Sequence, residues 1–258
     1  MTPDPPRRTR LRSRAIPVLA GVAAAGAIAA AVGAMLAADG GGLGAERMAE
    51  RGAEVPRTPL TEDEPKRSRQ PEPRGRRIDW RRSEAFGQPE AGRLERGVQL
   101  PFGGRNYFTW DPIQREAPNR GWRRWGTDRL VRTTLRVVRR FAAAHPRAPR
   151  VGIGDLSRPH GGDFGPRYGL PGHASHQNGL DVDVYYPRLD RRERAPTTVD
   201  HVDVALSQDL VDRFVQAGAE SVFVGPNTGL EGPSGVVVPL VNHDNHLHVR
   251  LPPRDAAG

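Results

Sequence analysis

The stretch from Asp39 to about Glu95 limits what this chain can fold into, because it contains almost no hydrophobic periodicity. It is rich in proline, glycine and charges of both signs, and such a composition buries too little apolar surface to offset the loss of chain entropy. Over all 258 residues only 36% are hydrophobic, with 25 prolines and 30 glycines. We therefore predict a disordered linker over 39–94 and one folded domain over 95–258, a size that suits a single hydrophobic core.

The first 38 residues are typical of an export element. Five arginines between positions 7 and 14 precede an uncharged run of mainly small and apolar residues from Ala15 to Ala38. As a helix this run would extend roughly 36 Å, enough to cross a bilayer. Small residues near Ala34 and Ala38 also suit a cleavage site, so a signal peptide and an N-terminal membrane anchor both remain open. Either one predicts an exported, periplasmic or otherwise extracytoplasmic domain, anchored in the second case to the inner membrane.

The positive charge does not indicate a nucleic-acid partner. The chain has 39 basic and 30 acidic residues, a formal charge of +9, and only Lys66 among the basic residues is a lysine. The arginines of the C-terminal part are scattered, and no recognisable nucleic-acid-binding motif is present. We therefore expect no nucleic acid among the partners, while the oligomeric state stays open.

The predicted domain has a mixed pattern of secondary structure. Apolar residues at helical spacing predict helices over 127–144 and 207–217, the second with Ser207 as its N-cap. Alternating or short apolar runs predict strands over 151–155, 180–184, 221–224 and 245–251. Because these elements do not repeat as βαβ units, we expect an α+β fold with a mainly antiparallel sheet flanked by helices.

The histidines are the most unevenly distributed residues in the chain. All eight lie in the last 114 positions, and the absence of cysteine excludes disulfides, thiolate metal sites and a cysteine nucleophile. Five of them fall in two short segments, GHASHQNGLDVD over 172–183 and HDNHLHVR over 243–250. The other three include His145 and His160, which we interpret as structural or surface residues.

Side chains alternate along a strand, so each segment presents its polar residues on one face. His246 and His248 share one face of the second segment, and Asp181 and Asp183 share one face of the first. Together with His176 they can supply two imidazoles and a carboxylate to one cation. Nitrogen and oxygen ligands of this kind suit Zn²⁺, and three protein ligands leave a position for water. Spacing alone does not choose between Asp181 and Asp183.

These segments resemble the signature of the LAS metallopeptidases, which include lysostaphin and D-alanyl-D-alanine peptidases. The sequences of the segments 172–183 and 243–251 more closely resemble those of penicillin-insensitive murein endopeptidases. Further support comes from the segments 97–101 and 153–155 and from Gly161-Gly162. The resemblance covers about 95–258. It implies a LAS-type core and one catalytic zinc ion, with His176, Asp183 and His248 as the metal ligands. It also implies that His246 is the general base or transition-state stabiliser. By the same resemblance, His173 and His243 line the site as supporting or proton-handling groups, so we interpret all three histidines as catalytic.

The implied function is zinc-dependent hydrolysis of the D-alanyl-diamino acid crosslink peptides of peptidoglycan by metal-activated water. Two alternatives stay open: a D,D- or L,D-carboxypeptidase with the same site, and a non-catalytic wall-binding module. The resemblance leaves room for a second metal ion, for which Asp200 and His201 are weak candidates. Arg158 stands where other LAS branches keep an oxyanion-binding arginine, and we interpret it as a surface residue.

Overall fold

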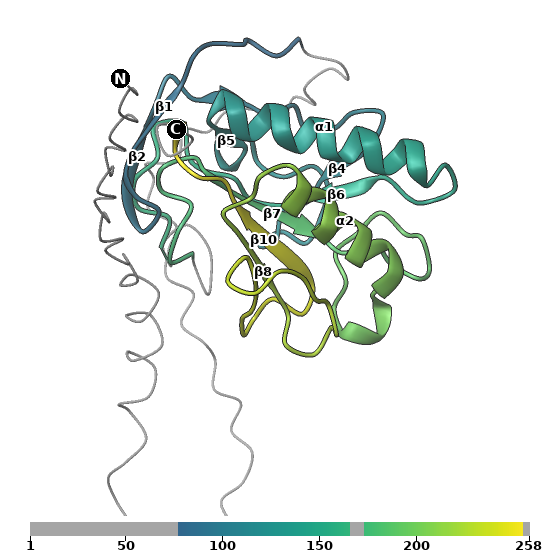
Figure 1. Ribbon diagram of the computed structural model, residues 1–258. Helices are drawn as coiled ribbons and strands as arrows, with labels where there is room; N and C mark the ends of the chain where they lie inside the picture. The colour runs from purple at the N-terminus through teal and green to yellow at the C-terminus, as the bar shows by residue number, and fades with distance from the viewer. Residues whose placement is uncertain (1–76, 166–172, 255–258) are drawn as a thin grey trace, which may run out of the picture. The chain divides into compact units, whose positions relative to one another are not determined.

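The computed structural model describes residues 77–165 and 173–254. Its main element is a six-stranded sheet with the strand order β4-β6-β7-β10-β8-β9 (Figure 1). These strands are β4 (Tyr107–Thr109), β6 (Val151–Ile153), β7 (Asp181–Tyr185), β8 (Ser221–Val224), β9 (Val237–Pro239) and β10 (His246–Arg250). The three central pairings are antiparallel, whereas the outer pairs β4–β6 and β8–β9 are parallel. The predicted α+β class with a mainly antiparallel sheet is thus confirmed.

Two helices lie side by side and cover one face of this sheet (Figure 1). They are α1 (Asp128–Ala144) and α2 (Val204–Gln216). Their buried apolar residues form one continuous core with the inward side chains of β7 and β10, namely Val182, Val184, Leu247 and Val249. The alternation expected for both strands is therefore present, and the polar residues of β7 and β10 lie on the opposite face of the sheet.

The boundaries of α1 follow from its sequence. Thr127 is the N-cap, and its side-chain oxygen accepts a hydrogen bond from the backbone N–H of Leu130 at 3.1 Å. Asp128 places a negative charge in the first turn, where it interacts favourably with the helix dipole. The helix ends before Pro146, so the prediction for 127–144 is confirmed within one residue.

The predicted start of α2 is wrong by three residues. Its N-cap is Asp203, whose carboxylate accepts a hydrogen bond from the backbone N–H of Leu206 at 3.1 Å. Ser207 lies inside the helix, and its hydroxyl donates to the Asp203 carbonyl at 2.7 Å. Both residue types make good N-caps, and only the backbone conformation of Asp203, which is extended, distinguishes them.

The folded part also begins before the predicted boundary at residue 95. β1 (Glu84–Gln88) and β2 (Ala91–Glu95) form an antiparallel hairpin within the segment that we interpreted as linker. A second small pair consists of β3 (Val98–Gln99) and β5 (Trp125–Gly126), and short 3₁₀ helices cover Gly121–Arg123 and Val199–His201. The remainder of the predicted linker, 39–76, lies outside the described residues and stays a prediction.

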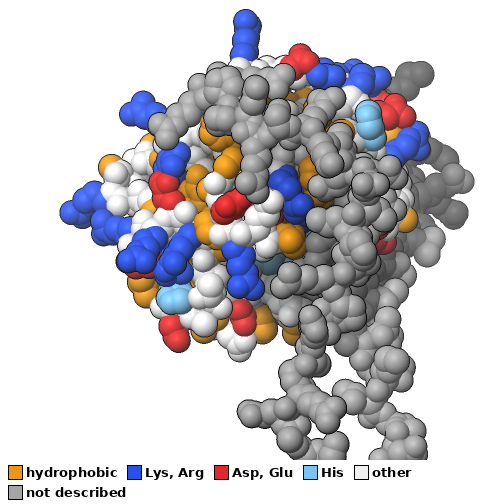
Figure 2. Space-filling view, turned by 180° about the vertical axis from the view of Figure 1, so that it is seen from behind, with side chains coloured by type: hydrophobic (Ala, Val, Ile, Leu, Met, Phe, Trp, Pro, Cys, Tyr) orange, Lys and Arg blue, Asp and Glu red, His pale blue; other side chains and the backbone are white. Residues whose placement is uncertain are grey.

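Charged side chains are interspersed over the surface seen from behind (Figure 2). Both basic and acidic side chains are present on this face of the described part of the chain. No helix within 77–165 and 173–254 is both long and apolar enough to cross a membrane. The apolar run 15–38, on which the predicted signal peptide or anchor depends, lies outside these residues.

Candidate metal centre

Pairing of β7 with β10 brings the two histidine segments together. Their antiparallel register places His248 opposite Asp183, His246 opposite Tyr185, and Arg250 opposite Asp181. All of these side chains lie on the sheet face that the helices do not cover, because their neighbours along each strand are core residues. Residues about 65 positions apart in the sequence thus form one polar surface.

Several histidine nitrogens converge on one carboxylate oxygen, Oδ1 of Asp183. The Nε2 atom of His176 lies 3.3 Å from it, Nδ1 of His248 lies 3.5 Å from it, and Nε2 of His246 lies 3.7 Å from it. On the other side of the carboxylate, Nε2 of His173 lies 3.8 Å from Oδ2. Ligand atoms around a tetrahedral zinc ion are about 3.3 Å apart when each bond is about 2.0 Å long.

The sixth predicted site residue, His243, stacks on the same cluster. Its ring centroid lies 4.8 Å from that of His246 and 5.9 Å from that of His248. Its Nδ1 atom lies 2.8 Å from the carbonyl oxygen of Val241, which holds the ring from outside the cluster. The structure therefore brings together all six residues that we singled out in the sequence: His173, His176, Asp183, His243, His246 and His248.

Hydrogen bonds behind the cluster determine which nitrogen each ring presents. Nδ1 of His176 is bonded to the carbonyl oxygen of Leu156, which can only accept, so the Nε2 lone pair faces Asp183. Nε2 of His248 is bonded to the carboxylate of Asp181 at 3.0 Å, which leaves its Nδ1 lone pair facing Asp183. Such outer partners fix the tautomer and orientation of metal-ligating histidines.

Asp181 therefore stands behind the cluster, although its residue type alone made it a candidate ligand. Its carboxylate accepts from Nε of Arg250 at 2.8 Å and from the backbone N–H of His176 at 3.1 Å. The second of these bonds holds His176 in a left-handed conformation, with φ of 69°. A non-glycine residue in this region costs about 1–3 kcal/mol, and such strain is concentrated at functional sites.

Asp155 is the residue of this site whose role the sequence did not reveal. It is completely buried and accepts hydrogen bonds from Nε of Arg123 at 2.7 Å and from the amide of Asn119 at 2.9 Å. Its Oδ2 atom lies 2.7 Å from Nε2 of His173. In the sequence Asp155 stands out only as part of the matching segment 153–155. Asn119 and Arg123 lie more than 30 residues from it in the sequence and His173 lies 18 residues from it, so no local signal identifies these partners.

Gly154 allows Asp155 and β7 to approach this closely. A Cβ atom at Gly154 would lie 3.0 Å from Cβ of Asp183 and 3.1 Å from the ring of Tyr185. Its backbone N–H also donates to the carbonyl of Asp183 at 2.8 Å. A glycine is thus required where the loop passes over the site.

Three buried carboxylates lie around the cluster, and only two have an arginine partner. Asp155 pairs with Arg123 and Asp181 with Arg250. Within the described part of the chain, no arginine or lysine lies within 4.0 Å of the Asp183 carboxylate, whose ion-pair contacts are all with histidines. A buried charge without a partner is costly, so this position favours a cation.

The pKa values agree with that charge balance. Burial lowers the pKa of the His176 ring, but the Asp183 carboxylate outweighs it and raises the pKa to about 9. Without a metal ion, a proton on His176 would therefore supply the positive charge that Asp183 requires. Burial lowers the pKa of His246 to about 3, so that ring is neutral at pH 7.

Two atoms of the cluster show that a metal ion fits. Nε2 of His176 and Oδ1 of Asp183 are both buried without a hydrogen-bond partner in the structure. Buried polar atoms are otherwise almost always paired. The ligand atoms of His173, His176 and Asp183 all lie within 4.8 Å of one another, so this group could bind a metal ion. The structure thus supports a metal centre of histidine and aspartate, and it leaves the metal unidentified.

The remaining candidates from the sequence, Arg158, Asp200 and His201, do not belong to the histidine cluster. Nη1 of Arg158 donates to the carbonyl of Asp163 at 2.9 Å. His201 contacts the hydroxyls of Thr197 and Thr198 through Nδ1, at 3.1 Å and 3.4 Å. Its neighbour Asp200 is exposed in the 3₁₀ helix Val199–His201, so a second metal there stays a prediction.

The comparison with known families identifies the class of protein, a peptidase that acts on murein. The chain belongs to the penicillin-insensitive murein endopeptidase family, whose model matches residues 85–216. The match contains His173, His176 and Asp183 and ends before the second histidine segment, which the pairing of β7 with β10 adds to the site. No match was found among curated proteins.

Proposed function

We propose that this chain is an exported, zinc-dependent endopeptidase that hydrolyses D-alanyl-diamino acid crosslinks of murein. The observation that carries the proposal is the convergence of His176, His248 and His246 on the single carboxylate oxygen of Asp183. The family supplies the substrate class, and the basic flank and apolar run of the first 38 residues motivate the export.

His176, Asp183 and His248 would hold the ion. Behind the site, Nδ1 of His176 is hydrogen-bonded to the carbonyl oxygen of Leu156. In the same way, Nε2 of His248 is hydrogen-bonded to the carboxylate of Asp181. His173 also has a carboxylate neighbour, because its Nε2 atom is bonded to Asp155. We therefore assign His173 to the lining of the site.

A zinc ion held by these ligands would polarise the scissile carbonyl and lower the pKa of a water molecule to about 7. His246 would act as the proton acceptor through its Nε2 atom. Its Nδ1 atom lies 2.6 Å from the side-chain oxygen of Asn245, which keeps the proton on Nδ1 and the lone pair on Nε2. The same ring can then pass the proton to the leaving amine, and His243 stacks behind it.

The test is incubation of the chain with purified crosslinked dimeric muropeptides, with and without chelator. We expect mass analysis to show two monomers, loss of cleavage in EDTA, and recovery on addition of zinc. Release of terminal alanine without separation of the dimer would instead indicate a carboxypeptidase. Binding to sacculi without any released peptide would indicate a wall-binding module, and full activity after exhaustive chelation would exclude the metal.

A further inference from the structure

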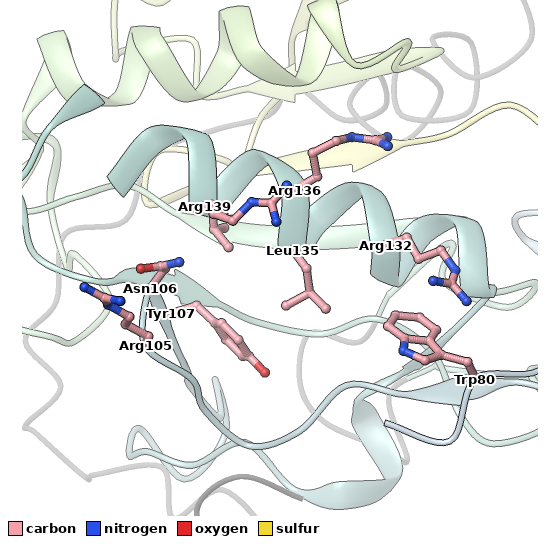
Figure 3. A pocket seen from close by; sticks show the side chains of 9 residues that line it. Trp80, Arg105, Asn106, Tyr107, Arg132, Leu135, Arg136 and Arg139 are labelled. Carbon is pink, nitrogen blue, oxygen red and sulfur yellow. The ribbon is translucent and has the colours of Figure 1, made fainter. Parts of the chain in front are cut away.

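A groove with four arginines lies between the exposed side of α1 and the segment that leads into β4. It has a volume of about 500 Å³. Trp80 and Arg132 lie at one end and Arg105 at the other, with Tyr107 and Leu135 between them (Figure 3). Arg136 and Arg139 of α1 also line it. None of the six residues of the metal centre lines this groove.

The groove and the metal centre lie on opposite sides of the six-stranded sheet. Leu135 and Tyr107 belong to the helix-side core or pack against it. The side chains of His248 and Asp183 point to the other side, since Val182, Val184, Leu247 and Val249 of the same strands fill the core. A ligand in the groove therefore cannot be in contact with the metal centre through the sheet.

The positive charges of the groove are poorly compensated. None of the described residues that line it is acidic. Arg105 and Arg139 are exposed, and neither lies within 4.0 Å of a carboxylate in the part of the chain that the structure describes. Nε of Arg132 lies 3.8 Å from Asp128, while Arg136 donates only to the Thr133 hydroxyl, at 3.0 Å. Arginines three and four positions apart on a helix repel one another, so folding does not explain their arrangement.

Trp80, at one end of the groove, holds a guanidinium group in place. The guanidinium carbon of Arg132 lies 3.8 Å from the ring centroid of Trp80, which holds this side chain over the indole. Trp80 remains 38% exposed. A fixed guanidinium beside a partly open indole suits a ligand that has an anionic group next to an apolar or sugar surface.

We propose that this groove is an anchoring site for murein, in which the arginines bind carboxylates of stem peptides away from the bond that is cleaved. The inference rests on the proposed function, because murein is the polymer that the family assigns. Stem peptides that are not crosslinked end in carboxylates, and the planar guanidinium fork matches a carboxylate in two parallel hydrogen bonds. A network polymer can reach both sides of the domain at once, which a small substrate cannot.

The test compares two variants of the full chain, each with three arginine substitutions in addition to His246→Ala. The histidine substitution keeps the wall from being digested. The groove variant is Arg105→Gln with Arg132→Gln and Arg139→Gln. The control removes the same charge from exposed arginines elsewhere, with Arg115→Gln, Arg192→Gln and Arg194→Gln. Co-sedimentation with purified sacculi should show at least a tenfold loss of affinity and a weaker salt dependence for the groove variant, and less than a twofold change for the control.

Chemically treated sacculi identify the anionic group. Binding should be lost when the wall carboxylates are amidated and retained when phosphodiester polymers are removed with hydrofluoric acid. The opposite pattern would overturn the proposal in favour of a phosphate polymer. Groove-dependent binding to anionic phospholipid vesicles or to DNA, without groove-dependent binding to sacculi, would overturn it as well.

Cleavage of soluble dimeric muropeptides, measured with His246 intact, separates this proposal from the proposed function. The groove substitutions should leave that cleavage unchanged. If the dimers are cut but sacculus binding does not depend on the groove, the anchoring site is wrong and the function stands. If no dimer is cut while sacculus binding still depends on the groove, the endopeptidase function is wrong and the groove stands.

Discussion

Asp181 holds three groups of the metal centre at once: the ring of His248, the guanidinium of Arg250 and the backbone of His176. Replacing it with asparagine keeps the shape but removes the carboxylate charge that orients His248. We expect Asp181→Asn to weaken zinc binding about 10- to 100-fold, as is usual when such an outer partner is lost. Competition with a chromophoric chelator measures the affinity.

The matched control is Asp212→Asn, at an exposed carboxylate that accepts a hydrogen bond from the side chain of Gln208. It should leave the zinc affinity unchanged. An equal affinity in the wild-type chain and in Asp181→Asn would show that His248 does not depend on this carboxylate. A circular-dichroism melt of each variant checks that the loss is not caused by unfolding around Arg250.

His248 and His246 lie on the same strand face but are assigned different roles. His248→Ala should abolish zinc binding, because Nδ1 of His248 is one of the three proposed ligand atoms. His246→Ala should retain zinc and lose turnover by about 10²- to 10⁴-fold, the usual contribution of a positioned general base. Elemental analysis together with cleavage of dimeric muropeptides measures both. Equal loss of zinc in the two variants would contradict this division.

At the level of elements, Thr127 caps the start of α1. We expect Thr127→Ala to lower the free energy of unfolding by about 1 kcal/mol, because the backbone N–H of Leu130 loses its partner. Thr127→Ser keeps the hydroxyl and should stay within about 0.5 kcal/mol of the wild type, as expected for an equivalent cap. Urea denaturation measures both. A loss of the same size in Thr127→Ser would show that the methyl group, and not the cap, is responsible.

Elements with a clear apolar period were predictable, and short ones were not. Strands β7 and β10 alternate apolar and polar residues, and α1 has a continuous apolar stripe, so the sequence patterns located them within a residue or two. The hairpin β1–β2 has only one buried residue, Leu94, and so resembles a linker. Patterns also cannot show strand order, and for this reason only the structure pairs β7 with β10.

In the candidate site, too, the sequence pattern predicts some features and tertiary packing decides the others. Alternation placed Asp181 and Asp183 on one face, but choosing between them required the cross-strand register, which sets Asp183 opposite His248 and Asp181 opposite Arg250. The contact of Asp155 with His173 depends on a loop crossing over β7 at Gly154. Contacts of this kind are determined by tertiary packing, which single-sequence patterns do not contain.

For the molecule as a whole, the metal centre joins parts that are distant in the chain. His176 and Asp183 precede α2, whereas His248 follows it on β10, near the end of the described residues. An unfolded chain does not hold these ligands together, so zinc binding should stabilise the native state. At a free zinc concentration about 100 times Kd the expected gain is about 2.7 kcal/mol. For a domain of this size, that corresponds to a rise in Tm of roughly 5–10 °C.

Differential scanning calorimetry with zinc, and again after addition of EDTA, measures this shift. The histidines of the unfolded chain also bind zinc weakly, which reduces the rise in Tm. His248→Ala is the internal reference, because it removes one proposed ligand and leaves seven of the eight histidines in place. We expect the rise in Tm to be small in this variant and full in His246→Ala. An equal rise in His248→Ala and the wild type would show that the stabilising ion binds elsewhere, whatever the effect on cleavage.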